Sequence, residues 1–202
     1  MSEPKRSPGR PKAAEGLDTR AELLAVARAL FSAKGYAGTS VSEVGKGAGV
    51  SVPVIYQRFG SKAGLFVATG EDVYDVGLAR LQASIDGLED FDAALEAALR
   101  EFVAISRTEP DMTGMVVMVL IEAERSRELA ADLKPMLRDF RAFCSAIAAL
   151  APESRAPGTR GQRNLALALE SMFSGLMVSS TLSKPADFRA LVDAMRHLVA
   201  PS

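Results

Sequence analysis

The side chains best suited to directed binding lie close together, between Thr39 and Lys62. A phenol, an amide and a guanidinium follow one another at Tyr56, Gln57 and Arg58, and the ammonium of Lys62 comes shortly after them. An amide can donate to and accept from one base edge, whereas a phenol or an ammonium can hold a phosphate. This chemistry is that of recognition rather than of bond making.

Residues typical of catalysis or metal binding are scarce. The chain has one histidine, His197, and one cysteine, Cys144, and it contains neither G-x-S-x-G nor H-E-x-x-H. Cys144 lies near Phe140, Phe143 and Ile147, which predicts a small buried hydrophobe rather than a redox group. A lone cysteine excludes an internal disulfide and fits a reducing cytoplasm. We therefore expect no enzyme activity, no cofactor and no metal.

Three short helices are predicted around the binding side chains. Apolar residues recur every three or four positions over 21–34, and Lys34-Gly35 is a typical helix end. The following residues mark a second and a third helix: the capping box Ser40–Glu43, the turn at Gly49, a cap at Ser51 and Pro53 in the first turn. Ile55 and Phe59 should face the core. This punctuation is typical of a helix-turn-helix.

The segment resembles the DNA-binding domain of TetR-family transcriptional repressors, and the likeness covers about the first third of the chain. The matching residues are Thr39-Ser40, Val44-Gly45, Ala48-Gly49-Val50-Ser51, Tyr56, Phe59, Ser61-Lys62 and Leu65-Phe66. Two departures stand out. Gly45 replaces the usual Ala and, with Gly47, should weaken the second helix by roughly 1 kcal/mol per Gly. Ala63-Gly64 replaces the usual acidic residues, which removes an extra cap from the fourth helix.

The resemblance implies that the third helix lies in the DNA major groove and reads bases. Apolar contacts to thymine methyls would come from Val52, Pro53 and Val54, and Gln57 suits an adenine edge. Phosphates would be held by Thr39, Tyr56 and Lys62, while Arg58 could do either.

A nucleotide loop is the rival interpretation of the glycines in Gly45–Gly49. The dinucleotide fingerprint is G-x-G-x-x-G after a buried strand. Here the third Gly comes one residue early, and a capped helix precedes it. We therefore reject nucleotide binding.

Charge is divided unevenly along the chain. Residues 1–66 hold ten Lys or Arg and five Asp or Glu, whereas the rest hold fourteen and twenty. The excess of positive charge in residues 1–66 should orient this part of the chain toward a polyanion. Residues 1–17 are expected to be a disordered basic arm, in which Gly9-Arg10-Pro11 resembles half of an AT-hook. Arg10 would enter the minor groove, or the arm would only add charge.

The remainder of the chain predicts an all-α body. We expect helices over 61–85, 91–108, 112–126, 128–150 (bent or interrupted near Pro135), 162–182 and 186–199, about nine in all. The longest apolar run, 115–121, is too short to cross a membrane. The expected domains are the arm, a helix-turn-helix domain over 18–62, and an effector-binding and dimerisation domain over 63–202.

The resemblance also implies a small-molecule cavity among the fourth to eighth helices. Flexible and aromatic side chains suited to a loosely shaped apolar ligand are Phe102, Met115, Met118, Phe140, Phe143 and Met172. The alternative is that these residues form ordinary core.

In the same family the last two helices pair across a two-fold axis. The stripe Leu169, Phe173, Leu176 and Ser180, together with Leu191 and Met195, would then form the dimer interface. The alternative is that both faces pack within their own chain.

The expected function is that of a cytoplasmic, nucleoid-associated repressor. It would hold a palindromic DNA operator as a homodimer and leave it when a small apolar effector binds, without contact with a membrane. The alternative is an activator or an effector-independent DNA-binding protein of the same fold.

Overall fold

The computed structural model describes residues 12–199, and the side chains of 19–197. Within this range the chain forms nine helices and no strand, which confirms the predicted all-α class. The helices are α1 (Lys12–Gly38), α2 (Val41–Gly47), α3 (Val52–Phe59), α4 (Lys62–Ile85), α5 (Phe91–Thr108), α6 (Pro110–Arg125), α7 (Ala130–Ala149), α8 (Gly158–Leu182) and α9 (Pro185–Val199).

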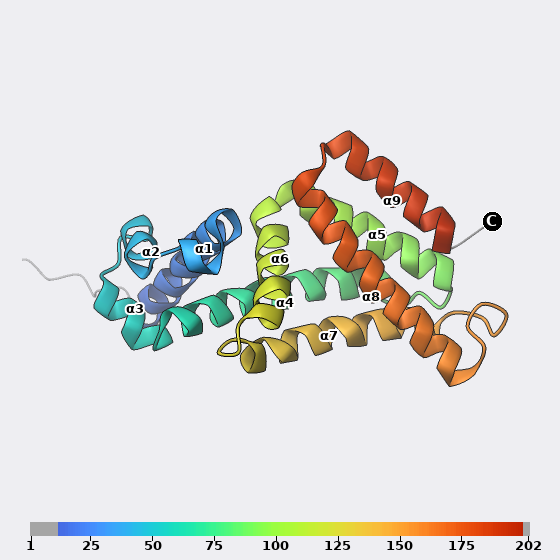
Figure 1. Cartoon of the computed structure of the whole chain (residues 1–202), viewed down its shortest axis with the longest axis horizontal. Coiled ribbons are helices and arrows are strands. Elements are labelled where there is room, and N and C mark those ends of the chain that lie inside the picture. Colours follow the sequence, from blue (N-terminus) through green and yellow to red (C-terminus); the bar gives the residue numbers. More distant parts are fainter. Residues whose placement is uncertain (1–11, 200–202) are drawn as a thin grey trace, which may run out of the picture.

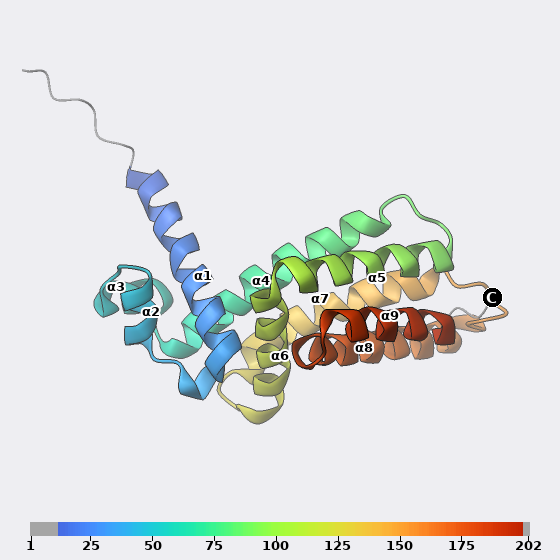
Figure 2. The same ribbon diagram turned by 90° about the horizontal axis from the view of Figure 1, so that it is seen from above.

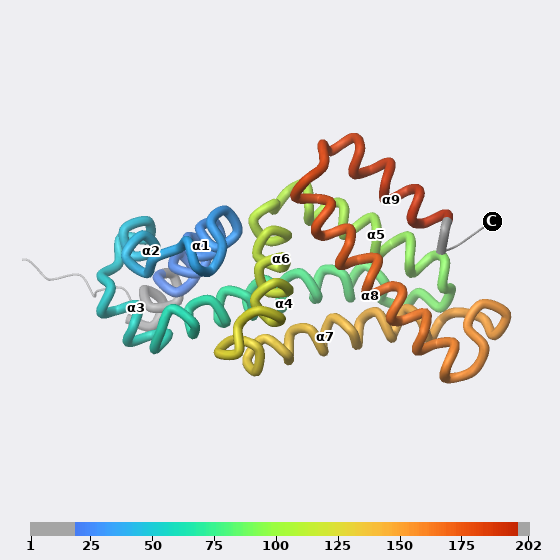
Figure 3. Tube along the Cα trace, viewed as in Figure 1, coloured from blue at the N-terminus to red at the C-terminus, as the bar shows by residue number. Residues whose placement is uncertain are grey.

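Helices α1 to α3 form an N-terminal domain at one end of the molecule, and α4 to α9 form a body at the other (Figures 1 and 3). Helix α1 begins at Lys12, within the range expected for the arm, and it breaks at Gly35, where φ is 72°. The expected end at Lys34-Gly35 therefore coincides with this break. The rings of Phe31 and Tyr36 pack against Phe66 of α4 at 5.0 and 5.2 Å between centroids.

The N-terminus of α2 is capped by side chains, as the sequence predicts. The Glu43 amide donates to Ser40 Oγ at 3.1 Å, and the Ser40 amide donates to the Glu43 carboxylate at 3.0 Å. Ser51 occupies the N-cap of α3, as expected, and its side chain accepts no capping hydrogen bond. The turn between the two helices uses Gly49 at φ 64°.

Gly45 and Gly47 are required by close packing. A Cβ on Gly45 would lie 2.6 Å from the carbonyl oxygen of Val50, whose own amide donates to the Gly45 carbonyl at 2.8 Å. A Cβ on Gly47 would lie 2.7 Å from a methyl group of Val26. The departure from Ala at Gly45 thus lets the turn close against α2, at the expense of helix propensity.

The body consists of long helices with one shared core (Figure 2). Helix α7 runs through Pro135 as one helix, so that of the expected bend or interruption the interruption is absent. Arg80 of α4 is paired with Glu101 of α5 and with Glu109 at the corner between α5 and α6, each at 2.7 Å. These two ion pairs connect α4 to that corner.

The N-terminal domain rests on the body largely through α1 and α6. A Cβ on Gly114 of α6 would lie 2.0 Å from Ser32 Oγ of α1, and Met118 Sδ lies 3.7 Å from the Cβ position of Gly35. Gly114 therefore allows a close crossing of the two helices, whereas a Cβ at Gly35 would make only an ordinary van der Waals contact. Helix α6 crosses the molecule between the N-terminal domain and the rest of the body (Figure 1).

Candidate DNA-contacting helix and apolar cavity

Helix α3 has one face in the core and one in solvent. Ile55 is fully buried and Phe59 is half-buried against the core, as the sequence predicts. On the other side Pro53, Tyr56 and Gln57 are exposed, and Tyr56 retains 46% of its surface. The buried anchor thus holds a phenol and an amide outward on a rigid helix.

The other residues predicted to contact DNA from α3 and from the arm are less uniform. Val52 and Val54 are half-buried, so that only part of each side chain is available to a base. Arg58 is exposed, and it also has a contact within the chain. Arg10 lies outside the described residues.

Thr39 is a structural residue in this conformation. It is 2% exposed, and its hydroxyl lies 3.1 Å from the Leu30 carbonyl oxygen and 2.9 Å from that of Gly35. The hydroxyl therefore closes the end of α1, and the phosphate contact expected from this residue stays a prediction.

Lys62 joins the N-terminal domain to α4. Its ammonium lies 4.6 Å from the centroid of the Tyr36 ring and donates to the Ala37 carbonyl at 3.4 Å. A cation held in this way is half-buried and can still face a phosphate from its open side. The residue therefore has a packing role that its sequence context did not indicate.

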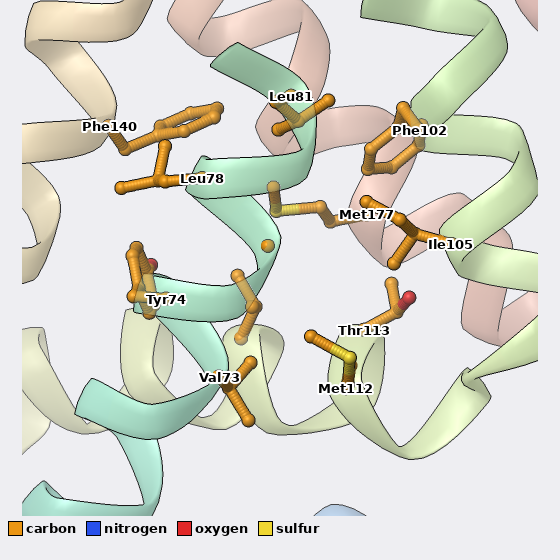
Figure 4. A pocket seen from close by; sticks show the side chains of 12 residues that line it. Val73, Tyr74, Leu78, Leu81, Phe102, Ile105, Met112, Thr113, Phe140 and Met177 are labelled. Atoms are coloured by element: carbon orange, nitrogen blue, oxygen red, sulfur yellow. The ribbon is translucent and has the colours of Figure 1, made fainter. Parts of the chain in front are cut away.

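An apolar cavity of about 50 Å³ lies among α4, α5, α6, α7 and α8 (Figure 4). Helix α4 contributes the largest share of its wall. The lining residues are Val73, Tyr74, Gly77, Leu78, Leu81, Phe102, Ile105, Met112, Thr113, Val116, Phe140 and Met177. None of them carries a charge, and the only polar side-chain atoms are the hydroxyls of Tyr74 and Thr113.

Two of the six residues predicted for the cavity line it, Phe102 and Phe140. Phe143 packs beside Phe140 at 6.4 Å between centroids, Met118 faces Gly35, and Met115 and Met172 belong to the buried core. These four residues do not line this cavity, because a flexible apolar residue serves a core as well as a cavity. The α4 residues were missed, although their spacing of three and four was visible in the sequence.

Three residues of the predicted dimer stripe on α8 face the core of their own chain. Leu169, Phe173 and Leu176 are fully buried in their own chain, where the Phe173 ring lies 5.8 Å from that of Phe102. Ser180, Leu191 and Met195 are half-buried. The outward face of α8 instead carries apolar and small residues: Leu167, Ala168, Ser171, Gly175, Val178 and Leu182.

By length and composition alone, α8 could also cross a membrane. A third of its most apolar stretch is buried in the chain's own core. The rest of its apolar character comes from the outward face described above. A helix with a core on one side and a protein partner on the other has the same composition.

The remaining reactive groups do not form a site. Burial raises the pKa of the Cys144 thiol to about 12, with a smaller contribution from the charge of Glu170. His197 is exposed. Among the described residues, no cluster of three or more His, Cys, Asp or Glu side chains could hold a metal ion.

Residues 23–69 match the family described as "Bacterial regulatory proteins, tetR family". The chain is 28% identical over 120 residues to the HTH-type transcriptional regulator UidR of Escherichia coli K12. The matched stretch is 59% of each protein. It is 30% identical over 125 residues to the regulator RutR of the same strain, covering 60% of this chain and 58% of RutR. The chain thus matches less than two thirds of the length of either relative.

Solved structures extend the likeness to the whole fold. Salmonella enterica GusR superposes with a TM-score of 0.73 over 94% of this chain and 97% of its own, at 22% identity. A TetR transcriptional regulator from Chloroflexus aurantiacus J-10-FL gives 0.74 over 94% and 98%, at 20% identity. The motif, the nine-helix arrangement and these relatives agree: the chain belongs to the TetR family of bacterial transcriptional regulators.

Proposed function

We propose that the chain is a transcriptional repressor that holds a palindromic DNA operator as a homodimer. Helix α3 would enter the major groove with Pro53, Tyr56 and Gln57 facing the DNA. The observation that supports this most directly is the anchoring of α3 by Ile55, which leaves those three side chains in solvent. Lys62, Arg58 and the arm with Arg10 would add phosphate and minor-groove contacts.

The outward face of α8 is the proposed interface with a second copy of the chain. Its exposed residues Leu167, Val178 and Leu182 would lose water on association, and Leu182 alone is 81% exposed. The small residues Ser171 and Gly175 between them would let two helices approach closely; a Cβ on Gly175 would meet no atom within 4 Å in the single chain. A two-fold axis would then place two copies of α3 on successive turns of one DNA face.

Helix α6 is the proposed link between the cavity and the DNA. Met112 and Thr113 line the cavity, whereas their neighbour Gly114 contacts Ser32 of α1. An effector that displaces α6 would therefore disturb the support of the N-terminal domain. We expect occupation of the cavity to change the spacing of the two α3 helices and to release the operator.

Operator selection followed by alanine substitution tests the proposal. DNA fragments bound by the purified protein are sequenced, and binding is then measured by fluorescence anisotropy. Gln57→Ala should cost about 1–3 kcal/mol on the selected site and relax one base position. Gln82→Ala, the same substitution at an exposed residue of α4 in the body, serves as the matched control.

A parent protein with no preference for any sequence would contradict the proposal. Sedimentation should show a dimer that Val178→Asp converts to a folded monomer of reduced operator affinity. If an effector strengthened binding to a promoter or had no effect, the chain would be the activator or effector-independent DNA-binding protein that the same fold allows.

A further inference from the structure

The wall of the cavity sets strict limits on what can occupy it. Its twelve lining residues include no Lys, Arg, His, Asp or Glu. Along α4, Asp72 and Asp75 are next to lining residues, but Asp75 is exposed and neither of them lines the cavity. The guanidinium of Arg80 is committed to Glu101 and Glu109 at 2.7 Å. An ionised ligand would find no counterion in this wall.

The two hydroxyls of the wall do not make the cavity more favourable for an anion. Tyr74 and Thr113 are each 5% exposed. Burial raises the pKa of the Tyr74 phenol, and the negative charge of Glu170 raises it further. The same desolvation and the same charge would act against a bound anion.

Size gives the second limit. A cavity of about 50 Å³ is too small for a drug-sized ligand, so that entry requires wall side chains to move. Met112 and Met177, which have three rotatable bonds each, are the most adaptable of them. Gly77 provides room on α4, because a Cβ there would still be 3.9 Å from Met112 Cε.

We propose that the effector is a neutral, compact, largely hydrocarbon molecule, about as large as one aromatic ring, and that ionised molecules of the same shape are excluded. It enters by displacing Met112 and Met177, and Gly77 sets the space that it finds. This inference rests on the proposed function in taking the cavity as the effector site. Burying an unpaired ion in such a wall costs several kcal/mol, which corresponds to an affinity at least roughly a hundredfold lower.

Three probes of matched shape test the proposal: toluene, benzoate and benzylammonium at neutral pH. Binding is followed without DNA, by thermal shift and by the NMR signals of ¹³C-labelled methionine methyl groups. Toluene should raise the melting temperature and shift the Met112 and Met177 signals, while that of Met195 on α9, which does not line the cavity, changes little. Benzoate and benzylammonium should do neither at the same concentration.

A graded pair of variants locates the ligand. Gly77→Ala should weaken toluene binding, and Gly77→Leu, which fills the cavity, should abolish it. Toluene shifts that survive in Gly77→Leu would overturn the proposal. The comparison of the three probes uses the unmodified protein, so a Gly77→Leu variant that fails to fold leaves that comparison intact.

A second pocket, lined by charged residues, would be occupied if the proposal is wrong. The groove between α5 and α9, of about 350 Å³, is bordered by four arginines and two carboxylates: Arg100, Arg107, Arg189, Arg196, Glu96 and Asp193. If benzoate bound better than toluene and Arg189→Ala removed that binding, the ligand would be an anion at this groove and the proposal would be wrong. DNA binding by the unliganded protein is measured separately, so a failed repressor hypothesis is distinguished from a failed ligand class.

Discussion

A methyl group added at Gly45 would lie 2.6 Å from a backbone oxygen, whereas one added at Gly77 would lie 3.9 Å from its nearest neighbour, the end of a methionine. The first glycine belongs to the N-terminal domain and the second to the cavity of the body. Contacts in the first region are fixed by backbone atoms and polar caps. Contacts in the second are made by side chains that can turn. One region is built to keep its geometry and the other to change it.

The largest effect is expected when Gly45 and Gly77 are each replaced by alanine. Gly45→Ala should destabilise the protein by about 1–3 kcal/mol, because the Val50 carbonyl oxygen cannot move without opening the turn. Gly77→Ala should instead stabilise it by up to about 1 kcal/mol, because it improves helix propensity and fills empty space. Urea unfolding of both variants is the measurement. Equal losses at the two sites would remove the distinction between the regions.

A smaller effect is expected where the two regions meet. Gly114→Ala should separate α6 from α1 at a cost of about 1–2 kcal/mol, because the new methyl would overlap Ser32 Oγ. Ser32→Gly removes the obstructing atoms, so the double variant should be more stable than the two single losses predict, by roughly 0.5–1 kcal/mol or more. Stability and operator affinity are measured for all four proteins. Strict additivity would show that this crossing does not set the helix separation.

The smallest effect concerns acid. Hydrogen bonds from Lys34 and from Ser40 lower the pKa of Glu43 from 4.5 to about 2 in the folded chain. Its contribution to stability is therefore present above pH 4.5 and is lost as the pH falls toward 2. Parent and Glu43→Gln should differ in melting temperature at pH 6 and converge near pH 2. Since both partners are exposed, salt should reduce the difference as well.

The sequence predicted the two regions unequally, and the reason is physical. Capping and turn signals such as Ser40–Glu43 and Gly49 act over a few residues, so they could be read locally and most helix limits followed. The cavity depends on which apolar side chains meet across five helices. Phe102 and Phe140 were found, but Met115 and Met172 have the same character and lie in the core. Leu169, Phe173 and Leu176 of the stripe predicted on α8 lie in the core for the same reason, since both faces of that helix are apolar.

The paired arginine on α4 has a mechanical consequence. Arg80 lies 18 residues beyond Lys62 along one continuous helix, which corresponds to about 27 Å. If the ion pairs to Glu101 and Glu109 act as a fulcrum, a tilt of about 5° there moves the far end of this lever by about 2 Å. In a symmetric pair the two ends would move in opposite senses, so their separation could change by about 4 Å. The length of α4 would thus convert a side-chain movement in the cavity into a mismatch with the DNA repeat.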